Sequence, residues 1–276
     1  MPAILVADMH LKPGAQPAQN AALRDFLREV LALRARRLIL LGDAFNWWFE
    51  RDGRVVGDYD EIFAAFASVA AAGVIIDHVS GNRDFMVGAG RPANRLDHAV
   101  YRGFFRGRGV NPVSRLTAAG INPRGFVCQF EQDGEKIFCA HGDMYALNPA
   151  GHGMMRWWTM SLPMRLFWAL APFAGLQFFF TRLQRRETLP YRRLLPKTEL
   201  IEPTVLAPLA DAGIDRFFCG HFHCGYRELT VTGAGIAADK ISARATLHII
   251  PSWLDRGAFA VLENRRLKIE QSLNES

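Results

Sequence analysis

The sequence has few cysteines and no long apolar run, and both absences narrow the class of protein. Its four cysteines show no CxxC or similar spacing, which argues against a disulfide scaffold or a cysteine metal site. The chain begins MPAILVADMH, without the basic leader and apolar stretch of a signal peptide, so we expect a reducing cytoplasm. The longest charge-free piece of its aromatic-rich segment, Leu166–Thr181, contains Pro172 and is too short to span a membrane.

The composition is that of a folded protein, and its positive net charge favours anionic binding partners. Half of the residues are hydrophobic and 22% are charged, with a net charge of +6. This charge favours nucleotides, phospholipid headgroups or nucleic acid. Because no lysine-rich stripe carries interleaved aromatics, we expect no nucleic acid partner. No GxGxxG follows the first predicted strand, which argues against a dinucleotide-binding fold.

The first 85 residues alternate buried strands with amphipathic helices. Strands are predicted at Ala3–Ala7, Leu38–Leu41 and Val74–Val79, and helices at Ala21–Ala35 and Asp60–Ala72. Such a βαβαβ pattern predicts a parallel sheet.

The later part predicts a hairpin, a short helix and further strands. The hairpin pairs Phe126–Glu131 with Lys136–Ala140 around an Asp-Gly turn. A helix is predicted at Thr204–Ala212, followed by strands at Arg216–Cys219, Tyr226–Val231, Ala245–Ile250 and Ala258–Leu262. We therefore expect one α/β domain over residues 1–276, with two packed sheets flanked by helices.

One interruption, at about 150–200, differs from the rest in composition. Its centre, Met154–Arg186, holds three tryptophans, several phenylalanines and five arginines, without an acidic residue. We interpret it as an inserted helical hairpin. It either completes the core as a cap, or lies in an anionic membrane interface, or lines an acyl-chain groove. Trp48, near the polar motifs described next, is a candidate for that groove.

Small polar clusters follow the ends of predicted strands. They are Asp8-Met9-His10, Gly42-Asp43, Gly81-Asn82-Arg83-Asp84, His141-Gly142-Asp143 and Gly220-His221-Phe222-His223. Ligands of open α/β sheets bind beyond the carboxyl ends of strands, so these clusters can converge on one crevice. Mixed Asp, Asn and His donors suit two divalent cations such as Mn²⁺, Zn²⁺ or Fe²⁺. The remaining histidines are expected to serve packing or the surface: His78, His98, His152 and His248.

This ordered series resembles the calcineurin-like metallophosphoesterases, which have a two-sheet αββα sandwich and a dinuclear metal centre. The resemblance implies that one metal would be bound by Asp8, His10, Asp43 and His223. It implies that the other would be bound by Asp43, Asn82, His141 and His221, so that Asp43 bridges. Two divalent ions are thus the expected cofactors, with Mn²⁺ preferred over Zn²⁺ or Fe²⁺.

Within that family, Gly42–Trp48 and Gly81–Gly88 resemble the UDP-2,3-diacylglucosamine hydrolases of lipid A biosynthesis. The resemblance implies hydrolysis of the pyrophosphate bond to UMP and 2,3-diacylglucosamine 1-phosphate, on the inner face of the cytoplasmic membrane. The sequence departs from that pattern at Leu147-Asn148-Pro149, Cys224-Gly225 and Leu254. The alternative is a metallophosphoesterase for another nucleotide, phosphodiester or phosphomonoester, with a nuclease less favoured.

The expected catalytic residues are Asp43, Asn82, Arg83 and His141. Arg83 would contact phosphate oxygens with its planar guanidinium and, with Trp48, bind the substrate. Asp84 and Asp143 would orient neighbouring histidine or arginine side chains.

Overall fold

The computed structural model describes residues 1–14, 16–51, 53–84, 87, 113–143, 161–186, 206–233 and 244–271. Two of the histidines expected to lie outside the site, His98 and His152, fall outside these residues. So do the departure at 147–149 and residues 154–160 of the insertion.

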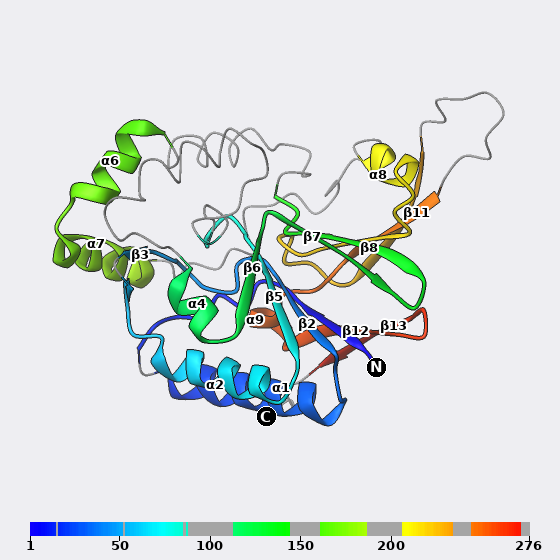
Figure 1. Cartoon of the computed structure of the whole chain (residues 1–276), viewed down its shortest axis with the longest axis horizontal. Coiled ribbons are helices and arrows are strands. Elements are labelled where there is room, and N and C mark those ends of the chain that lie inside the picture. The colour runs from blue at the N-terminus through cyan, green and yellow to red at the C-terminus, as the bar shows by residue number, and fades with distance from the viewer. Residues whose placement is uncertain are drawn as a thin grey trace.

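Two mixed sheets form the centre of the molecule (Figure 1). The first sheet has the order β13-β12-β1-β2-β5-β6. Its strands are β1 Ala3–Val6, β2 Arg37–Leu41, β5 Ile75–Val79, β6 Ile121–Gly125, β12 Ala258–Glu263 and β13 Arg266–Gln271. β1, β2, β5 and β6 run parallel, which confirms the parallel sheet predicted from the βαβαβ pattern.

The second sheet has the order β10-β11-β9-β8-β7. Its strands are β7 Val127–Gln132, β8 Glu135–Ala140, β9 Arg216–Cys219, β10 Arg227–Thr232 and β11 Arg244–Ile249. β7 and β8 pair antiparallel around Asp133 and Gly134, which both have positive φ, as a tight hairpin turn requires.

Apolar side chains fill three layers, one between the sheets and one on each outer face. Between the sheets, Leu5, Ile39 and Val79 of the first face Cys139 and Phe218 of the second. The outer face of the first sheet is covered by α1 Pro17–Ala32 and α2 Asp60–Ala71, which lie side by side in Figure 1. The outer face of the second is covered by α8 Ala207–Asp211. This confirms the αββα sandwich.

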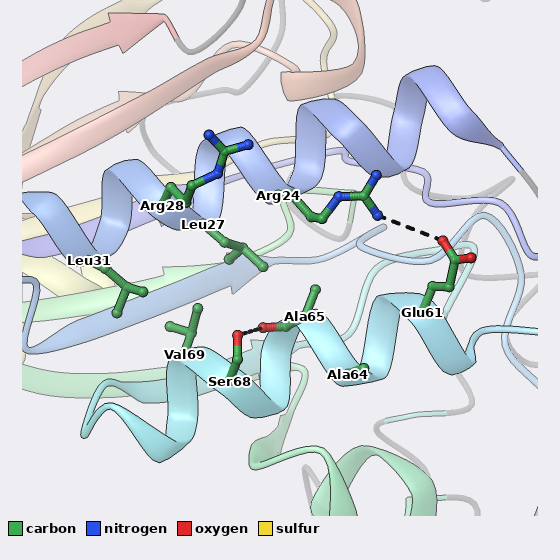
Figure 2. A pocket seen from close by; sticks show the side chains of 9 residues that line it. All are labelled: Arg24, Leu27, Arg28, Leu31, Glu61, Ala64, Ala65, Ser68 and Val69. Carbon is green, nitrogen blue, oxygen red and sulfur yellow. Dashed lines mark hydrogen bonds and ion pairs between the residues drawn. The ribbon is translucent and has the colours of Figure 1, made fainter.

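A groove of about 410 Å³ lies between α1 and α2 (Figure 2). It is lined by residues of these two helices alone: Arg24, Leu27, Arg28, Leu31, Glu61, Ala64, Ala65, Ser68 and Val69. None of them belongs to the polar clusters, so this groove is separate from the candidate site.

Short elements connect the layers. They are the hairpin β3 Glu50–Arg51 and β4 Arg54–Val55, and the helices α4 Ser114–Ala118 and α9 Trp253–Arg256. The described part of the insertion forms two consecutive helices, α6 Leu162–Leu170 and α7 Phe173–Arg186. No helix of the described residues is long and apolar enough to cross a membrane. The extent of the domain and the lipid-facing role of 150–200 stay predictions.

Candidate metal centre

The structure brings together residues from all five polar clusters. Asp8 and His10 follow β1, Asp43 follows β2, Asn82 follows β5, His141 follows β8, and His221 and His223 follow β9. All are buried except His223, which is half-buried. Strand ends of both sheets therefore supply one cluster, as the sequence predicts.

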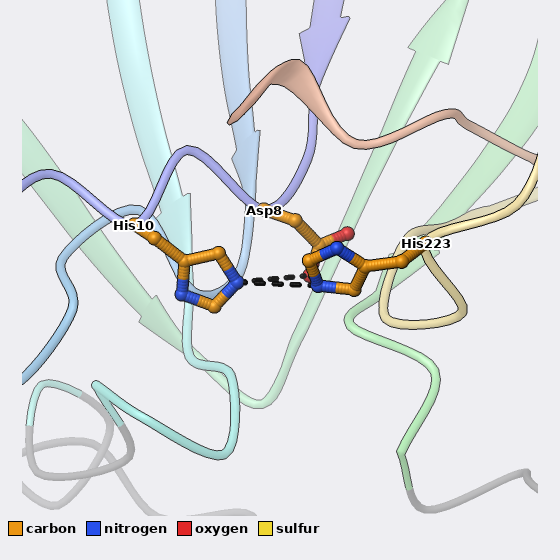
Figure 3. A group of neighbouring side chains, drawn as sticks. All are labelled: Asp8, His10 and His223. Carbon is orange, nitrogen blue, oxygen red and sulfur yellow. Dashed lines mark hydrogen bonds and ion pairs between the residues drawn. The ribbon is translucent and has the colours of Figure 1, made fainter. Parts of the chain in front are cut away.

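One group of donors consists of Asp8, His10 and His223 (Figure 3). The Nε2 atoms of His10 and His223 lie 3.3 Å apart. Asp8 Oδ1 lies 4.0 Å from the Nε2 of His10 and 3.6 Å from that of His223. Three donor atoms therefore face a common point.

A second group consists of Asp8, Asp43 and His141. Asp43 Oδ2 lies 3.6 Å from His141 Nε2 and 3.9 Å from His10 Nε2. Asn82 Oδ1 lies 3.1 Å from the same His141 nitrogen. Asp43 thus stands between histidines of the two groups, where a bridging carboxylate would be needed.

The chemistry of these atoms fits divalent cations. Asp8 Oδ1 is fully buried and accepts no hydrogen bond from any described residue, although a buried polar atom normally has a partner. Burial raises the pKa of Asp8 and that of Asp43 to about 7. A bound cation would reverse these shifts because it stabilises the carboxylates in their charged form.

Hydrogen bonds orient two of the histidines toward the cluster. His141 Nδ1 lies 2.9 Å from the carbonyl oxygen of Leu41. Because a carbonyl only accepts, Nδ1 carries the proton and Nε2 is left to bind a metal. His223 Nδ1 donates in the same way to Asp255 Oδ2 at 2.8 Å. Burial lowers the pKa of His141, but Asp43 and Asp8 outweigh it and bring the value to about 9.

The backbone is strained at the candidate ligands. Left-handed φ angles of 46–74° occur at Asp8, His10, Asp43, His221 and His223. Such angles are uncommon for residues other than glycine and concentrate at functional sites. The backbone amides of the turns also bind the ligands, since His221 N donates to Asp8 Oδ2 at 2.8 Å and Arg83 N to Asp43 Oδ1 at 2.8 Å.

Glycines in the motifs let ligand side chains lie against the backbone. A Cβ atom at Gly81 would lie 2.0 Å from Asp43 Oδ1, and one at Gly220 would lie 2.6 Å from Asp8 Oδ2. One at Gly42 would meet the ring of His141 at 2.5 Å. The motifs need glycine because any larger residue would displace a candidate ligand.

Asp84 joins two of the turns. Its carboxylate accepts hydrogen bonds from Gly81 N at 2.7 Å and from the Asp43 and Phe45 amides at 3.3 Å each. His78 Nε2 lies 2.8 Å away in a fully buried contact. Burial alone would raise the pKa of Asp84, but His78 and the Gly81 amide outweigh it and lower the value.

Sequence reasoning missed two residues that support the site. His78, expected to serve packing or the surface, is buried and is paired with Asp84. Its only signal is its position near the end of a strand that leads to a polar motif. Asp255, which holds His223, lies in α9, beyond the five polar clusters and next to Leu254, where the sequence departs from the family pattern.

Three further residues lie as follows. Arg83 is buried, and its guanidinium carbon lies 5.2 Å from the ring centre of Trp47. Asp143 is buried, and its charge acts on His141. Trp48 is 1% exposed and packs among Phe45, Tyr59 and Phe63. Its ring thus belongs to the core of the described residues, and its role in a substrate groove stays a prediction.

The fold and the site thus define an α/β sandwich protein with a cluster that could hold metal ions. No family model matches the chain. Its sequence is similar to a UDP-2,3-diacylglucosamine hydrolase of Ralstonia nicotianae, 30% identical over 61% of this chain and 56% of that protein. A hydrolase of the same name from Neisseria meningitidis serogroup B is 39% identical over 32% of this chain and 35% of that protein. Another, from Aeromonas hydrophila, is 28% identical over 64% of this chain and 62% of that protein.

The chain therefore spans less than two thirds of the length of these relatives. The similarity confirms the resemblance predicted from the motifs. Among solved structures, a dimetal phosphatase from Danio rerio is 14% identical with a TM-score of 0.44, over 99% of this chain and 97% of that one.

Proposed function

We propose that this protein hydrolyses the pyrophosphate bond of UDP-2,3-diacylglucosamine to UMP and 2,3-diacylglucosamine 1-phosphate. The observation that carries the proposal is the convergence of Asp8, His10, Asp43, His141 and His223 on donor groups that could hold metal ions. Similarity to relatives bearing the name of that activity supports the substrate.

Two sets of residues, which share Asp43, would bind the two metal ions. Asp8, His10, Asp43 and His223 would hold one divalent ion, and Asp43, Asn82, His141 and His221 the second. Two such ions supply a nucleophile from water near neutral pH and neutralise phosphoryl oxygens. Mixed nitrogen and oxygen donors suit a borderline or hard cation, and we prefer Mn²⁺, with Zn²⁺ or Fe²⁺ as alternatives.

Arg83 would bind the substrate's phosphate oxygens. Its guanidinium is buried beside the cluster, and its charge lowers the pKa of His10 in addition to the effects of burial and His223. A planar, permanently charged group matches a phosphate in two hydrogen bonds and offsets charge that develops during cleavage.

The lipid part of the substrate would meet helices α6 and α7 at the cytoplasmic face of an anionic membrane. Apolar side chains on these helices are exposed to solvent: Leu166, Phe167, Leu170, Phe178 and Phe179. Such a surface, together with exposed Arg182, suits the boundary between acyl chains and anionic headgroups.

The test is UMP release from UDP-2,3-diacylglucosamine in the presence of Mn²⁺ and detergent, with Asp43→Ala as the blank. Release that needs both the metal and Asp43 is the expected result. Cleavage of a generic phosphodiester without UMP release would keep the metal centre and reject the lipid substrate. Release that persists in Asp43→Ala would reject the site.

A further inference from the structure

A chain of ring contacts joins the candidate phosphate-binding arginine to the inserted helix α7. Trp47 lies between them: the guanidinium carbon of Arg83 is 5.2 Å from its ring centre. The ring of Phe180 on α7 lies 6.2 Å from Trp47, centre to centre. Phe180 and Arg83 are both buried, at 5% and 6% exposure, whereas Trp47 is half-buried and packs against the core.

The backbone of Trp47 is anchored independently of its ring. The hydroxyl of Tyr59 donates to the Trp47 carbonyl oxygen at 3.0 Å. Burial raises the pKa of that hydroxyl, so it remains a donor at every physiological pH. The backbone of Trp47 is therefore fixed, and the side chains around the indole ring determine its orientation.

The helix is also held by the β3–β4 hairpin and by Phe49 just before it. Arg51 donates to the Ala171 carbonyl oxygen at 2.8 Å, just before α7 begins. The guanidinium carbon of Arg54 lies 4.4 Å from the ring centre of Phe173. Phe49 stacks on Phe180 with ring centres 5.9 Å apart and an interplanar angle of 23°. A shift of α7 would therefore move Phe180 against the ring of Trp47.

We propose that Trp47 is a positioning residue, which holds the Arg83 guanidinium toward the substrate's phosphate and couples its placement to helix α7. The proposal rests on the proposed role of Arg83. A cation over an aromatic face is attracted by the ring, more strongly where water is excluded. An arginine held in this way loses less side-chain freedom when it binds phosphate. A substrate lipid that binds to α7 would then help to hold the Arg83 guanidinium in position.

The kinetic test is a double-mutant cycle. In Trp47→Leu we expect kcat/KM for UDP-2,3-diacylglucosamine to fall roughly 2- to 30-fold with metal content unchanged. Trp47→Phe should restore most of the loss because it keeps an aromatic face. In an Arg83→Ala background, Trp47→Leu should have no further effect. Equal losses in both backgrounds would overturn the proposal, as would a Trp47→Leu enzyme with wild-type kinetics.

A second readout needs no substrate and so separates this proposal from the proposed function. In protein labelled with 5-fluorotryptophan, the ¹⁹F resonance that disappears in Trp47→Phe belongs to Trp47. It should move in Arg83→Ala and in Phe180→Leu. It should stay in place in Phe178→Leu, the matched control, whose ring on the same helix is 68% exposed. An inactive wild type with this pattern would reject the lipid substrate and keep the coupling, whereas a resonance indifferent to Phe180→Leu would reject the coupling.

Discussion

At the scale of single residues, the missing side chain of glycine is as necessary to the site as the ligands. A Cβ atom at Gly81 would stand 2.0 Å from Asp43 Oδ1. We therefore expect Gly81→Ala to displace the carboxylate of Asp43, the proposed bridging ligand, with a loss of bound metal and of about 1–3 kcal/mol in the free energy of unfolding. Metal analysis after dialysis and denaturant unfolding measure the two effects.

Gly175→Ala is the control for that variant. Gly175 lies in helix α7, and a Cβ atom there would meet nothing within 4 Å. In a helix the change to alanine should stabilise the protein by about 0.4–1 kcal/mol and leave metal content unchanged. If Gly81→Ala binds metal as well as Gly175→Ala does, Asp43 is not a ligand in the position described.

A second prediction concerns Asp84, because its carboxylate accepts hydrogen bonds from three backbone amides and pairs with His78. Asp84→Asn keeps the shape but places an amide group against these donors, so metal affinity should fall roughly 10- to 100-fold. Since the folded-state pKa of Asp84 lies below its ordinary value, the stability it adds is complete above about pH 4 and is lost in more acidic solution. The difference in stability between wild type and variant should therefore narrow as the pH falls below 4. Metal titration measures the loss of affinity, and unfolding at a series of pH values measures the difference in stability. Unchanged metal affinity in Asp84→Asn would contradict the role of Asp84 in organising the site.

The convergence of the candidate ligands could be predicted from the sequence because each follows a strand end within a short motif. Asp255 could not, since its contact with His223 depends on how α9 packs beside β12, and no motif records this. Trp47 and Trp48 show a further limit: adjacent aromatic residues point to different surroundings, and only the structure tells which one meets Arg83.

At the scale of elements, the two edge strands of the first sheet, β6 and β13, were not predicted, whereas β7 and β10 at the edges of the second sheet were. β6 contains Pro123 and lies at the edge of the first sheet, where a missing amide proton costs no ladder bond. β13, at the opposite edge, is mostly polar and exposed, so it lacks the apolar run by which β1 and β2 are recognised. α1 begins at Pro17 rather than at the expected Ala21 because proline is well suited to the first helical turn.

Helix α7 carries a prediction of its own, since its two faces differ. Phe178 and Phe179 are 68% and 51% exposed, whereas Leu176 and Phe180 are buried. Replacing both exposed rings by serine should leave the fold intact and weaken binding to anionic vesicles roughly tenfold or more, because each buried phenylalanine stabilises by about 1.5–3 kcal/mol. Vesicle flotation measures the bound fraction.

The matched control removes exposed apolar groups from another helix. Leu31 and Leu33, in and just after α1, are 37% and 38% exposed, and their serine variants should bind vesicles as wild type does. Equal loss in the two double variants would mean that the α7 face has no special part in membrane binding.

At the scale of the whole molecule, the cluster of candidate ligands joins the two sheets at their strand ends. Asp8 and Asp43 come from the first sheet, and His141 and His223 from the second. Ions bound between them would therefore act as a clamp across the sandwich, and their removal should destabilise the entire fold rather than one loop.

The size of that effect follows from mass action. A cation that binds only the folded state adds about 2.7 kcal/mol at 100 times its Kd, which corresponds to a rise in Tm of roughly 5–10 °C for a chain of this length. We expect Mn²⁺ to raise the Tm of the chelator-treated protein by this amount, as measured by calorimetry. Asp43→Asn should abolish the response because it removes the carboxylate that stands between the two groups of histidines. A variant that gains as much Tm from Mn²⁺ as wild type does would place the stabilising ion elsewhere in the molecule.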